Sequence, residues 1–296
     1  PIPGKKDWTV SFDLDSLYPH LMMQYNMSPE TLLRDKRENV NADMVLNGDY
    51  KNMYPEEFSV CANGVCFSNK KLGVIPSIIT ELYDYRKKVK QEMLKYEQKE
   101  QDEKDPVKRK EIKRQITQLH NRQMSVKISM NSLYGALANR YFLYYVKEIA
   151  EAITTSGQLS VRYGAKSINA YLNKALKTDD LDYIEYIDTD SNYVNMSPVV
   201  QAAFGTIDVE PKKAEKFLSK ISTDKIQPVL DAGYDELAHS MGAYRNAMSM
   251  KLEKITNTTI FLGKKRYLMN TLSSEGVHYE TPKISMTGVE AIRSST

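Results

Sequence analysis

Two long helical segments joined by a short turn constrain the fold of this chain most. Pro76 suits the first turn of a helix because its fixed φ matches that position, and apolar residues then recur at helical spacing to about residue 99. A charged turn at residues 102–106 precedes a second helical pattern, which runs to about residue 138. The expected buried stripe of the first helix consists of Ile78, Ile79, Leu82, Tyr85, Val89 and Met93. Such an α-hairpin is too thin to enclose a core, so it must pack on, or project from, a body formed by the rest of the chain.

The rest of the chain predicts a body of mixed helix and strand. With 296 residues, 41% of them hydrophobic, the chain is long and apolar enough to bury a core. Strands are predicted over residues 8–14, 250–255, 265–269 and 283–286, and helices over residues 16–25, 148–177 and 211–241, with a kink at Pro228. Residues 30–75 predict a small irregular or β-rich excursion. The expected core of the middle helix is Ile149, Ile153, Leu159, Val161, Ile168 and Leu172.

A short acidic segment lies between two apolar or aromatic runs. Residues 183–187 and 192–196 are predicted to be strands, so residues 188–191 form the tip of a tight β-hairpin. In an extended backbone Asp188 and Asp190 would point to the same side. Two carboxylates so close repel each other unless a cation lies between them, and hard oxygen ligands suit Mg²⁺. The alternative is an acidic turn that faces water.

Another carboxylate stands where a strand meets a helix. Asp13 lies near the C-terminal end of the first predicted strand, and Ser16 opens the helix that follows. A helix start offers unpaired backbone N–H groups beside this carboxylate, a combination suited to metal and phosphate. Asp15 would point to the same side if the strand continued, so spacing alone leaves the choice between Asp13 and Asp15 open.

Positive charge is concentrated on the helical hairpin. Residues 86–122 contain 13 Lys and Arg against 7 Asp and Glu, whereas the whole chain carries a net charge of only +3. The remainder is therefore mildly acidic. This distribution suits a protein that grips phosphates with one part and binds metal with another, and a solvated helix surface is the alternative.

One face of the second long helix carries a cation, an amide and an amphipathic ring. Lys127, Asn131 and Tyr134 share this face because they lie at i, i+4 and i+7. Gly135 follows, and a glycine inside a helix lowers its stability by about 1 kcal/mol. This glycine indicates that another group approaches closely, and the alternative is a polar face that ends in a helix-terminal glycine.

The two cysteines do not predict a disulfide scaffold. A turn at Asn63-Gly64 separates Cys61 from Cys66, so the two could face each other across a hairpin, but two buried free thiols are the prediction. A zinc site would need more ligands than this neighbourhood offers. The sequence shows no signal peptide and no apolar run of membrane-spanning length. Pro1 stands in place of an initiator Met, which predicts a processed or excised segment.

Three motifs, taken together and in this order, have one explanation. Residues 13–19, 127–135 and 186–191 follow the patterns D-x-x-S-L-Y-P, K-x-x-x-N-S-x-Y-G and Y-x-D-T-D-S. They resemble motifs A, B and C of the family B DNA polymerases, in particular the replicative polymerases of T-even-type phages. Further segments that resemble that group are residues 28–31, 131–137, 152–158, 263–267 and 293–296. The resemblance covers nearly the whole chain.

The resemblance implies an α+β fold and a division into domains. Residues 1–75 and 140–296 would form the palm, an antiparallel sheet flanked by helices, and residues 76–139 the inserted helical hairpin called the fingers. The family's exonuclease domain would lie before Pro1 and its thumb after Thr296. The chain is therefore expected to be a palm-and-fingers piece, either a split-gene product or a truncated fragment.

The same resemblance implies DNA-templated DNA synthesis with two Mg²⁺ ions, for which Mn²⁺ is a substitute. Asp13 and Asp188 would be the metal ligands with the backbone of Leu14, and Asp190 would belong to the same catalytic site as a supporting partner. The motif favours Asp13 over Asp15, which fills a variable position and is left as a surface or supporting acid. Glu253 would stand at the edge of the metal site.

The resemblance also implies nucleotide and primer contacts. The residues expected to bind the dNTP are Ser16, Leu17, Tyr18, Arg86, Lys90, Lys127 and Asn131. Arg86, Lys90 and Lys127 would clamp the triphosphate, and Tyr18 would exclude a ribose 2′-OH by steric clash. Tyr134 and Gly135 would lie at the nascent base pair, where minor-groove acceptors are common to all correct pairs. The residues expected to hold the primer are Lys264, Lys265, Arg266 and Tyr267.

Two positions depart from the family pattern. Lys251 stands where the phage enzymes usually have an acid, two residues before Glu253, and His20 replaces the usual small residue after the motif A proline. The edge of the metal site is therefore less well predicted than its centre.

The expected partners are primer-template DNA, dNTPs, a separate exonuclease and thumb polypeptide and, through that missing part, a sliding clamp, with no membrane. The expected location is the cytoplasm of a host cell. One alternative is a DNA-binding subunit that is inert until the separate chain joins it. Another is a two-metal nuclease, which has no need for Lys127, Asn131 or Tyr134. A reverse transcriptase is disfavoured because its hairpin normally carries two adjacent aspartates.

Overall fold

The computed structural model describes residues 2–289 and divides into two compact units. The sheet unit contains the chain up to Leu14, Gly164–Ala232 and the chain from Met250 onward. The helical unit contains Asp15–Tyr163 and Gly233–Ser249. Pro1, and the segment 293–296 that entered the family resemblance, lie outside the described residues. None of the helices described has the length and apolar character needed to cross a membrane.

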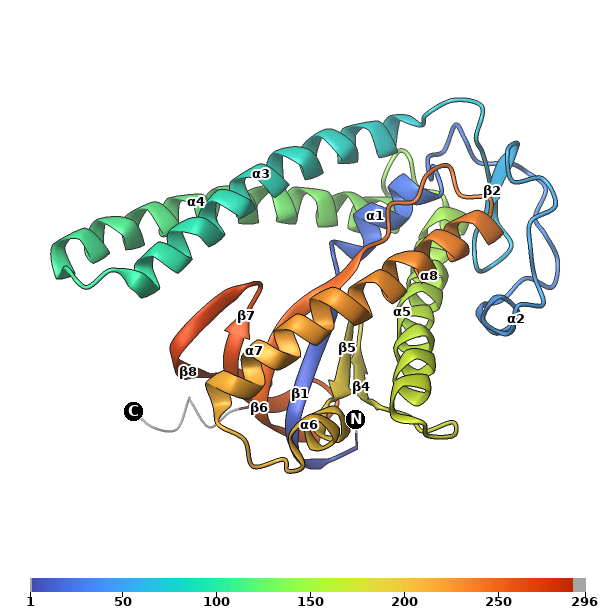
Figure 1. Ribbon diagram of the computed structural model, residues 1–296. Coiled ribbons are helices and arrows are strands. Elements are labelled where there is room, and N and C mark those ends of the chain that lie inside the picture. The colour runs from blue at the N-terminus through green and yellow to red at the C-terminus, as the bar shows by residue number, and fades with distance from the viewer. Residues whose placement is uncertain (1, 290–296) are drawn as a thin grey trace. The chain divides into compact units, whose positions relative to one another are not determined.

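A six-stranded antiparallel sheet forms the centre of the sheet unit (Figure 1). Its strands are β1 (Gly4–Leu14), β4 (Ile184–Asp188), β5 (Ser191–Asn195), β6 (Met250–Gly263), β7 (Arg266–Ser274) and β8 (Val277–Thr287), in the order β4-β5-β1-β6-β7-β8. The side chains of Val10, Phe12 and Leu14 are fully buried. The strand β1 is therefore an interior strand, hydrogen-bonded on both sides and packed in the core. The expected mixture of helix with an antiparallel sheet is confirmed.

Helices α6 (Ser197–Phe204) and α7 (Pro211–Ile221) also belong to the sheet unit. A π-helical turn, Ser222–Ile226, follows α7 and leads into α8 (Gln227–Ser240), which ends in the helical unit. The expected disturbance near Pro228 is thus a local widening of the helix just before the proline. Proline has no N–H to donate and its ring crowds the preceding turn, so the regular α-helical ladder is interrupted there.

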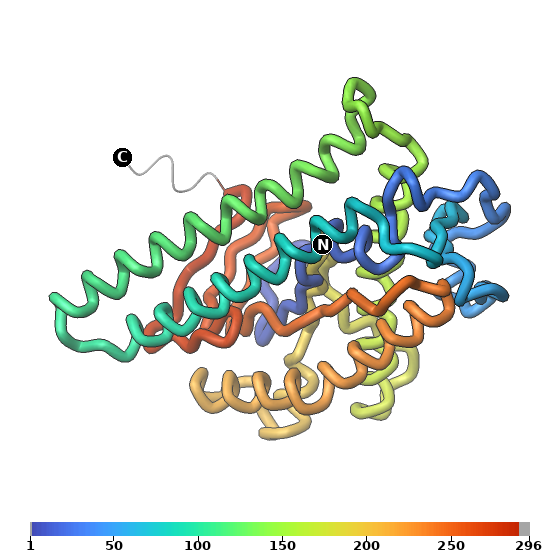
Figure 2. The backbone as a smooth tube through the Cα atoms, turned by 90° about the horizontal axis from the view of Figure 1, so that it is seen from above, coloured from blue at the N-terminus to red at the C-terminus, as the bar shows by residue number. Residues whose placement is uncertain are grey.

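The helical unit is dominated by two long antiparallel helices, α3 (Val74–Asp102) and α4 (Pro106–Leu137), which run side by side in Figure 2. Val89 and Met93 of α3 pack with Leu119 of α4 in one buried cluster. The α-hairpin is confirmed, but α3 begins at Val74, two residues before Pro76. Ile78 and Tyr85 are 48% and 47% exposed, so their expected place in the buried stripe was wrong.

The remaining elements of the helical unit are α1 (Leu17–Gln24), α2 (Ala42–Asn47), the hairpin β2 (Phe58–Val60) and β3 (Cys66–Ser68), and α5 (Lys147–Leu176), which ends in the sheet unit. All six residues of the expected α5 core are buried. Cys61 and Cys66 are buried free thiols, as predicted. Gly64 has φ +80°, and a Cβ there would lie 2.0 Å from the carbonyl oxygen of Arg37, so the turn between the two cysteines requires glycine.

The assignment of residues 76–139 as fingers and of the rest as palm remains a prediction.

Candidate active site

The acidic hairpin of the sheet unit forms as expected. Asp188 ends β4 and pairs with Ser191, which begins β5, so Thr189 and Asp190 alone form the loop. Thr189 has φ 55°, the left-handed conformation that such a two-residue turn requires. Because the turn interrupts the extended backbone, strand geometry does not place the side chains of Asp188 and Asp190 on the same side, as the sequence had predicted. The backbone N–H of Asp190 instead bonds to the carbonyl of Asp188 at 2.6 Å.

The end of β1 meets this hairpin. Asp13 pairs with Ser191, and the hydroxyl of Ser191 donates a hydrogen bond of 2.6 Å to Oδ1 of Asp13. The backbone N–H of Leu14 donates to the carbonyl of Asp190 at 2.9 Å. Two acidic motifs that are far apart in the sequence therefore lie on adjacent strands.

The electrostatic environment of Asp13 is strongly unfavourable to its ionised form. Burial first, and then the neighbouring charges of Asp190 and Glu253, raise the pKa of the Asp13 carboxyl to about 7, although the hydrogen bond from Ser191 and the charge of Lys254 act in the opposite direction. The negative charge gathered at the end of β1 thus exceeds what the neighbouring cations balance.

Asp188 lies near the basic turn between β6 and β7. The ammonium of Lys265 is 3.6 Å from Oδ1 of Asp188, and the backbone N–H of Lys265 donates to the hydroxyl of Tyr186 at 2.9 Å. Lys264 and Lys265 form the turn and Arg266 begins β7, so the three cations are exposed around a strand start as predicted.

Glu253 lies on β6 among partners that the sequence did not indicate. Its Oε2 accepts a hydrogen bond of 3.0 Å from the Ser11 hydroxyl, and its Oε1 lies 2.7 Å from the ammonium of Lys254. Lys251, the residue that departs from the family pattern, pairs with Asp13 across β1 and β6 and is exposed. The charge of Glu253 acts on Asp13 and raises its pKa, and the place of Glu253 at the edge of a metal site stays a prediction.

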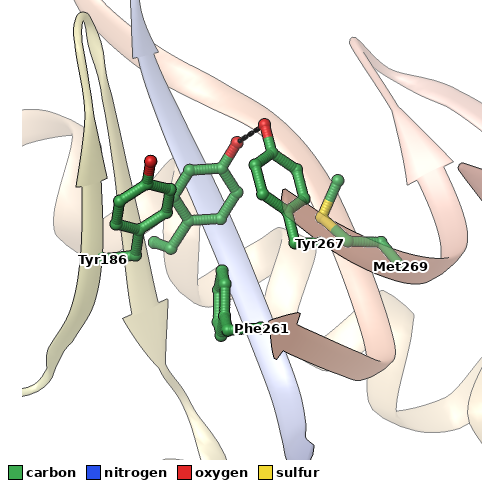
Figure 3. Close-up of a cluster of buried hydrophobic side chains, with 5 residues drawn as sticks. Tyr186, Phe261, Tyr267 and Met269 are labelled. Carbon is green, nitrogen blue, oxygen red and sulfur yellow. Dashed lines mark hydrogen bonds between the residues drawn. The ribbon is translucent and has the colours of Figure 1, made fainter. Parts of the chain in front are cut away.

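A buried cluster of four aromatic residues and one methionine supports the hairpin and the strand after the basic turn (Figure 3). It consists of Tyr186, Tyr193, Phe261, Tyr267 and Met269. The hydroxyls of Tyr193 and Tyr267 are 3.0 Å apart. Tyr267 is only 7% exposed, so its ring lies in the core rather than beside the exposed cations with which it was grouped as a primer-binding residue.

The donor chemistry of this region fits a hard divalent cation. Within residues 2–289, no three His, Cys, Asp or Glu side chains are arranged closely enough to form a metal-binding group by themselves. Asp13 and Asp190, whose negative charges repel each other, nevertheless supply carboxylate oxygen atoms. A small cation with oxygen ligands would relieve that repulsion.

The nucleotide-binding residues predicted from the sequence lie in the helical unit. Ser16 precedes α1 with a left-handed φ of 46°, and its side chain makes no capping hydrogen bond to the helix. The rings of Tyr18 and Tyr134 lie 4.5 Å apart between centroids. Lys127 and Asn131 are exposed on α4, and no atom lies within 4 Å of where a Cβ of Gly135 would be.

Arg86 is buried, unlike the exposed cations of α4. Its side chain is 7% exposed, and it donates hydrogen bonds to Oγ of Ser16 at 2.9 Å and to Oε1 of Gln123 at 3.3 Å. Its Nη1 lies 3.9 Å from Oδ1 of Asp15. Tyr83, one turn before Arg86 on α3, donates to Oδ2 of Asp15 at 2.5 Å.

Asp15, which the sequence left as a surface or supporting acid, is partly buried. Burial raises the pKa of the Asp15 carboxyl, but the hydrogen bond from Tyr83 and the positive charges of His20, Lys90 and Arg86 outweigh burial and hold the pKa below its usual value. His20, the other departure from the family pattern, packs edge-on against Tyr83 at 4.3 Å between centroids. Sequence reasoning missed Tyr83, although its i, i+3 spacing from Arg86 places both on one face of α3.

Comparison with known proteins gives the family of the chain. DNA polymerase family B matches residues 6–296. The chain belongs to this family. The family B resemblance predicted from the three motifs is thereby confirmed.

Two of its family B relatives are phage enzymes. The chain is 29% identical to the DNA-directed DNA polymerase of Escherichia phage RB69 and 29% identical to that of Enterobacteria phage T4, with 100% of the chain and 38% of each relative aligned. It is 26% identical to the DNA polymerase beta of African swine fever virus, over 96% of the chain and 24% of that relative. The chain thus spans well under half the length of these relatives.

Proposed function

We propose that this chain catalyses DNA-templated addition of a deoxynucleotide to a primer 3′-OH, the reaction of a DNA-directed DNA polymerase in phage DNA replication. The observation that carries the proposal is the union of motifs A and C at the end of β1, where Ser191 bonds to Asp13 beside Asp190. Family membership and the phage relatives support it.

In this proposal Asp13 and Asp188 hold two Mg²⁺ ions together with the Leu14 backbone, and Asp190 and Glu253 balance charge nearby. Mn²⁺ is the expected substitute. Bound ions of this kind stabilise negative charge on the attacking and leaving oxygens. The raised pKa of Asp13 supports the assignment, because a carboxyl in this environment is ionised most readily when a cation is present.

The helical unit supplies the nucleotide contacts in the same proposal. Lys127 and Asn131 are exposed on one face of α4, and Arg86 and Lys90 are on α3. These four side chains, with the backbone N–H groups of Ser16 and Leu17, would bind the triphosphate. Tyr18 would exclude ribonucleotides, and Tyr134 and Gly135 would contact the nascent base pair.

The exposed turn cations Lys264, Lys265 and Arg266 would hold the primer strand through its phosphates. The buried ring of Tyr267 would support that turn from below rather than bind DNA itself. We also propose that residues 76–139 are the fingers, and that a separate exonuclease and thumb polypeptide, with a sliding clamp bound through it, completes the enzyme in the host cytoplasm.

Primer extension tests the proposal. The chain is incubated with a recessed DNA duplex, dNTPs and Mg²⁺, beside Asp188→Ala and beside Asp179→Ala, which removes an exposed aspartate of the same unit. Extension that Asp188→Ala abolishes and Asp179→Ala preserves is the expected result. Extension only after a thumb-bearing chain is supplied would favour the split enzyme, in which this chain is inert alone. No extension by the folded chain with any partner would overturn the proposal.

A further inference from the structure

Arg86 is held by protein groups on two other segments of the helical unit. Ser16 lies at the start of α1, Asp15 lies just before it, and Gln123 lies on α4. With 7% of its side chain exposed, Arg86 has little surface left for a ligand. A phosphate can therefore bind this guanidinium only in exchange for some of the present contacts.

The Asp15 carboxylate is fixed on both of its oxygens. Tyr83 donates to Oδ2, the Ser16 hydroxyl lies 3.3 Å from Oδ1, and Arg86 lies 3.9 Å from that same oxygen. Asp15 and Arg86 thus form a half-buried ion pair between α3 and the segment before α1. A carboxylate and a phosphate oxygen are alternative partners for the same guanidinium.

We propose that Asp15 is an internal counter-ion that occupies Arg86 until a nucleoside triphosphate displaces it. The inference rests on the proposed function, and within it Asp15 is a positioning residue that acts through Arg86. Displacement leaves the bonds of Asp15 to Tyr83 and Ser16 in place, so only the guanidinium changes partner. The exchange lowers the apparent affinity for every phosphate ligand and lowers it most for ligands with few charges, which compete poorly with a fixed carboxylate.

The test is a double-mutant cycle on nucleotide affinity. Asp15→Asn keeps the shape of the side chain and an oxygen that accepts from Tyr83, but removes the charge. Its partner in the cycle is Arg86→Gln. The matched control is Asp43→Asn, which removes the same charge from an exposed pair with Arg162 in the same unit. The dissociation constant of the next correct dNTP is measured with a 3′-dideoxy-terminated primer-template and Mg²⁺.

The expected result is that Asp15→Asn tightens dNTP binding about fivefold, since a partly exposed ion pair contributes on the order of that factor to an equilibrium. The gain disappears in the Arg86→Gln background, and Asp43→Asn has no effect. Tyr83→Phe removes the hydrogen bond that fixes Asp15. The less firmly held carboxylate then competes less well for Arg86, so dNTP binding tightens by a smaller factor. A thermal unfolding curve for each variant confirms that the comparison is between folded proteins.

Three outcomes overturn the inference. Asp15→Asn could weaken binding or leave it unchanged, which would make Asp15 a support for Arg86 and not a competitor for it. The gain could persist in the Arg86→Gln background, which would show direct repulsion of the triphosphate by Asp15. If Asp15→Asn fails to fold, an unchanged or weakened affinity in Tyr83→Phe decides against the exchange. A wild-type protein that binds no dNTP at all would overturn the proposed function itself, and this result is distinct from the three outcomes above.

Discussion

The hydroxyl of Ser191 donates a hydrogen bond of 2.6 Å to the carboxylate of Asp13. This bond crosses from β5 to β1 at the point where the two acidic motifs meet, and it favours the ionised form of Asp13 against burial and the charge of Asp190. Ser191 therefore increases the ionised fraction of Asp13 at neutral pH.

Ser191→Ala is expected to move the acid limb of the activity profile to higher pH. Loss of the hydrogen bond raises the pKa of Asp13 above its present value of about 7. The acid limb is expected to move by about half a pH unit to one pH unit, which is the size of the pKa change that the loss of one hydrogen bond to a carboxylate causes. Single-nucleotide incorporation measured from pH 6 to 9 checks this. Ser197→Ala, which removes a hydroxyl bound to the Asp7 carbonyl of the same unit, should leave the profile unchanged.

Asp13→Asn is expected to stabilise the metal-free protein at pH 8. A folded-state pKa of about 7 against an ordinary value of 3.8 means that ionised Asp13 disfavours the folded state. The gain in unfolding free energy should be on the order of 2 kcal/mol above pH 7, allowing for relaxation around the charge. It should shrink as the pH falls from 7 towards 4. Denaturant unfolding in EDTA measures it, and a destabilised variant at pH 8 would contradict the reasoning.

Tyr18→Ala is expected to weaken discrimination against ribonucleotides. Tyr18 lies at the start of α1 with its ring against Tyr134, and a smaller residue would open space where a 2′-OH is expected to clash. The ratio of kcat/KM for dNTP over rNTP should fall on the order of a hundredfold, since steric selection of one small group reaches that scale. Tyr54→Ala, which removes an exposed tyrosine elsewhere in the helical unit, serves as the control. An unchanged ratio in Tyr18→Ala would remove this residue from sugar selection.

Lys265→Ala is expected to weaken primer-template binding in a salt-dependent way. If the exposed ammonium contacts one phosphate, its loss lowers the slope of log affinity against log salt by about 0.9. Fluorescence anisotropy between 50 and 200 mM salt measures the slope. Lys212→Ala removes an exposed lysine of α7 in the same unit and should not change it. Equal slopes for Lys265→Ala and the wild type would place the primer elsewhere.

Tyr267→Phe is expected to lower stability without changing DNA affinity. The variant keeps the buried ring but leaves the Tyr193 hydroxyl without this partner. The loss should be about 1 kcal/mol, and Tyr193→Phe should match it because the bond is shared. Tyr267→Ala should lose about 3 to 5 kcal/mol by opening a cavity. A selective loss of primer affinity in Tyr267→Phe would restore the direct DNA role given to it by the motif.

The sequence predicted local elements well because their causes are local. The hairpin at residues 188–191 and the core of α5 follow from turn chemistry and periodicity, and both are confirmed. Neighbours across the fold were not accessible in this way. Ser191 and Asp13 are 178 residues apart, and only the register of β5 on β1 brings them together. Tyr267 was misplaced because a strand that begins with exposed cations gives no sign of which following ring turns inward.

Residue spacing also does not indicate how deeply a charged side chain is buried. Arg86 and Lys127 are both cations on the hairpin, but Arg86 faces α1 and is buried whereas Lys127 is exposed on α4. Helical spacing specifies a face, not what covers it. The contact of Tyr83 with Asp15 depends on how α3 packs against the segment before α1, which no local pattern encodes.

The interior position of β1 has a consequence for how this protein inactivates. Asp13 is held by the ladder that β1 shares with β5, and the carbonyl of Asp190 is bound from the same strand end by Leu14. Separation of β5 from β1 would break the contact between the two acidic motifs, while β1 would still be paired with β6. On heating, this contact should therefore be lost no later than the protection of the β1 amides from hydrogen exchange.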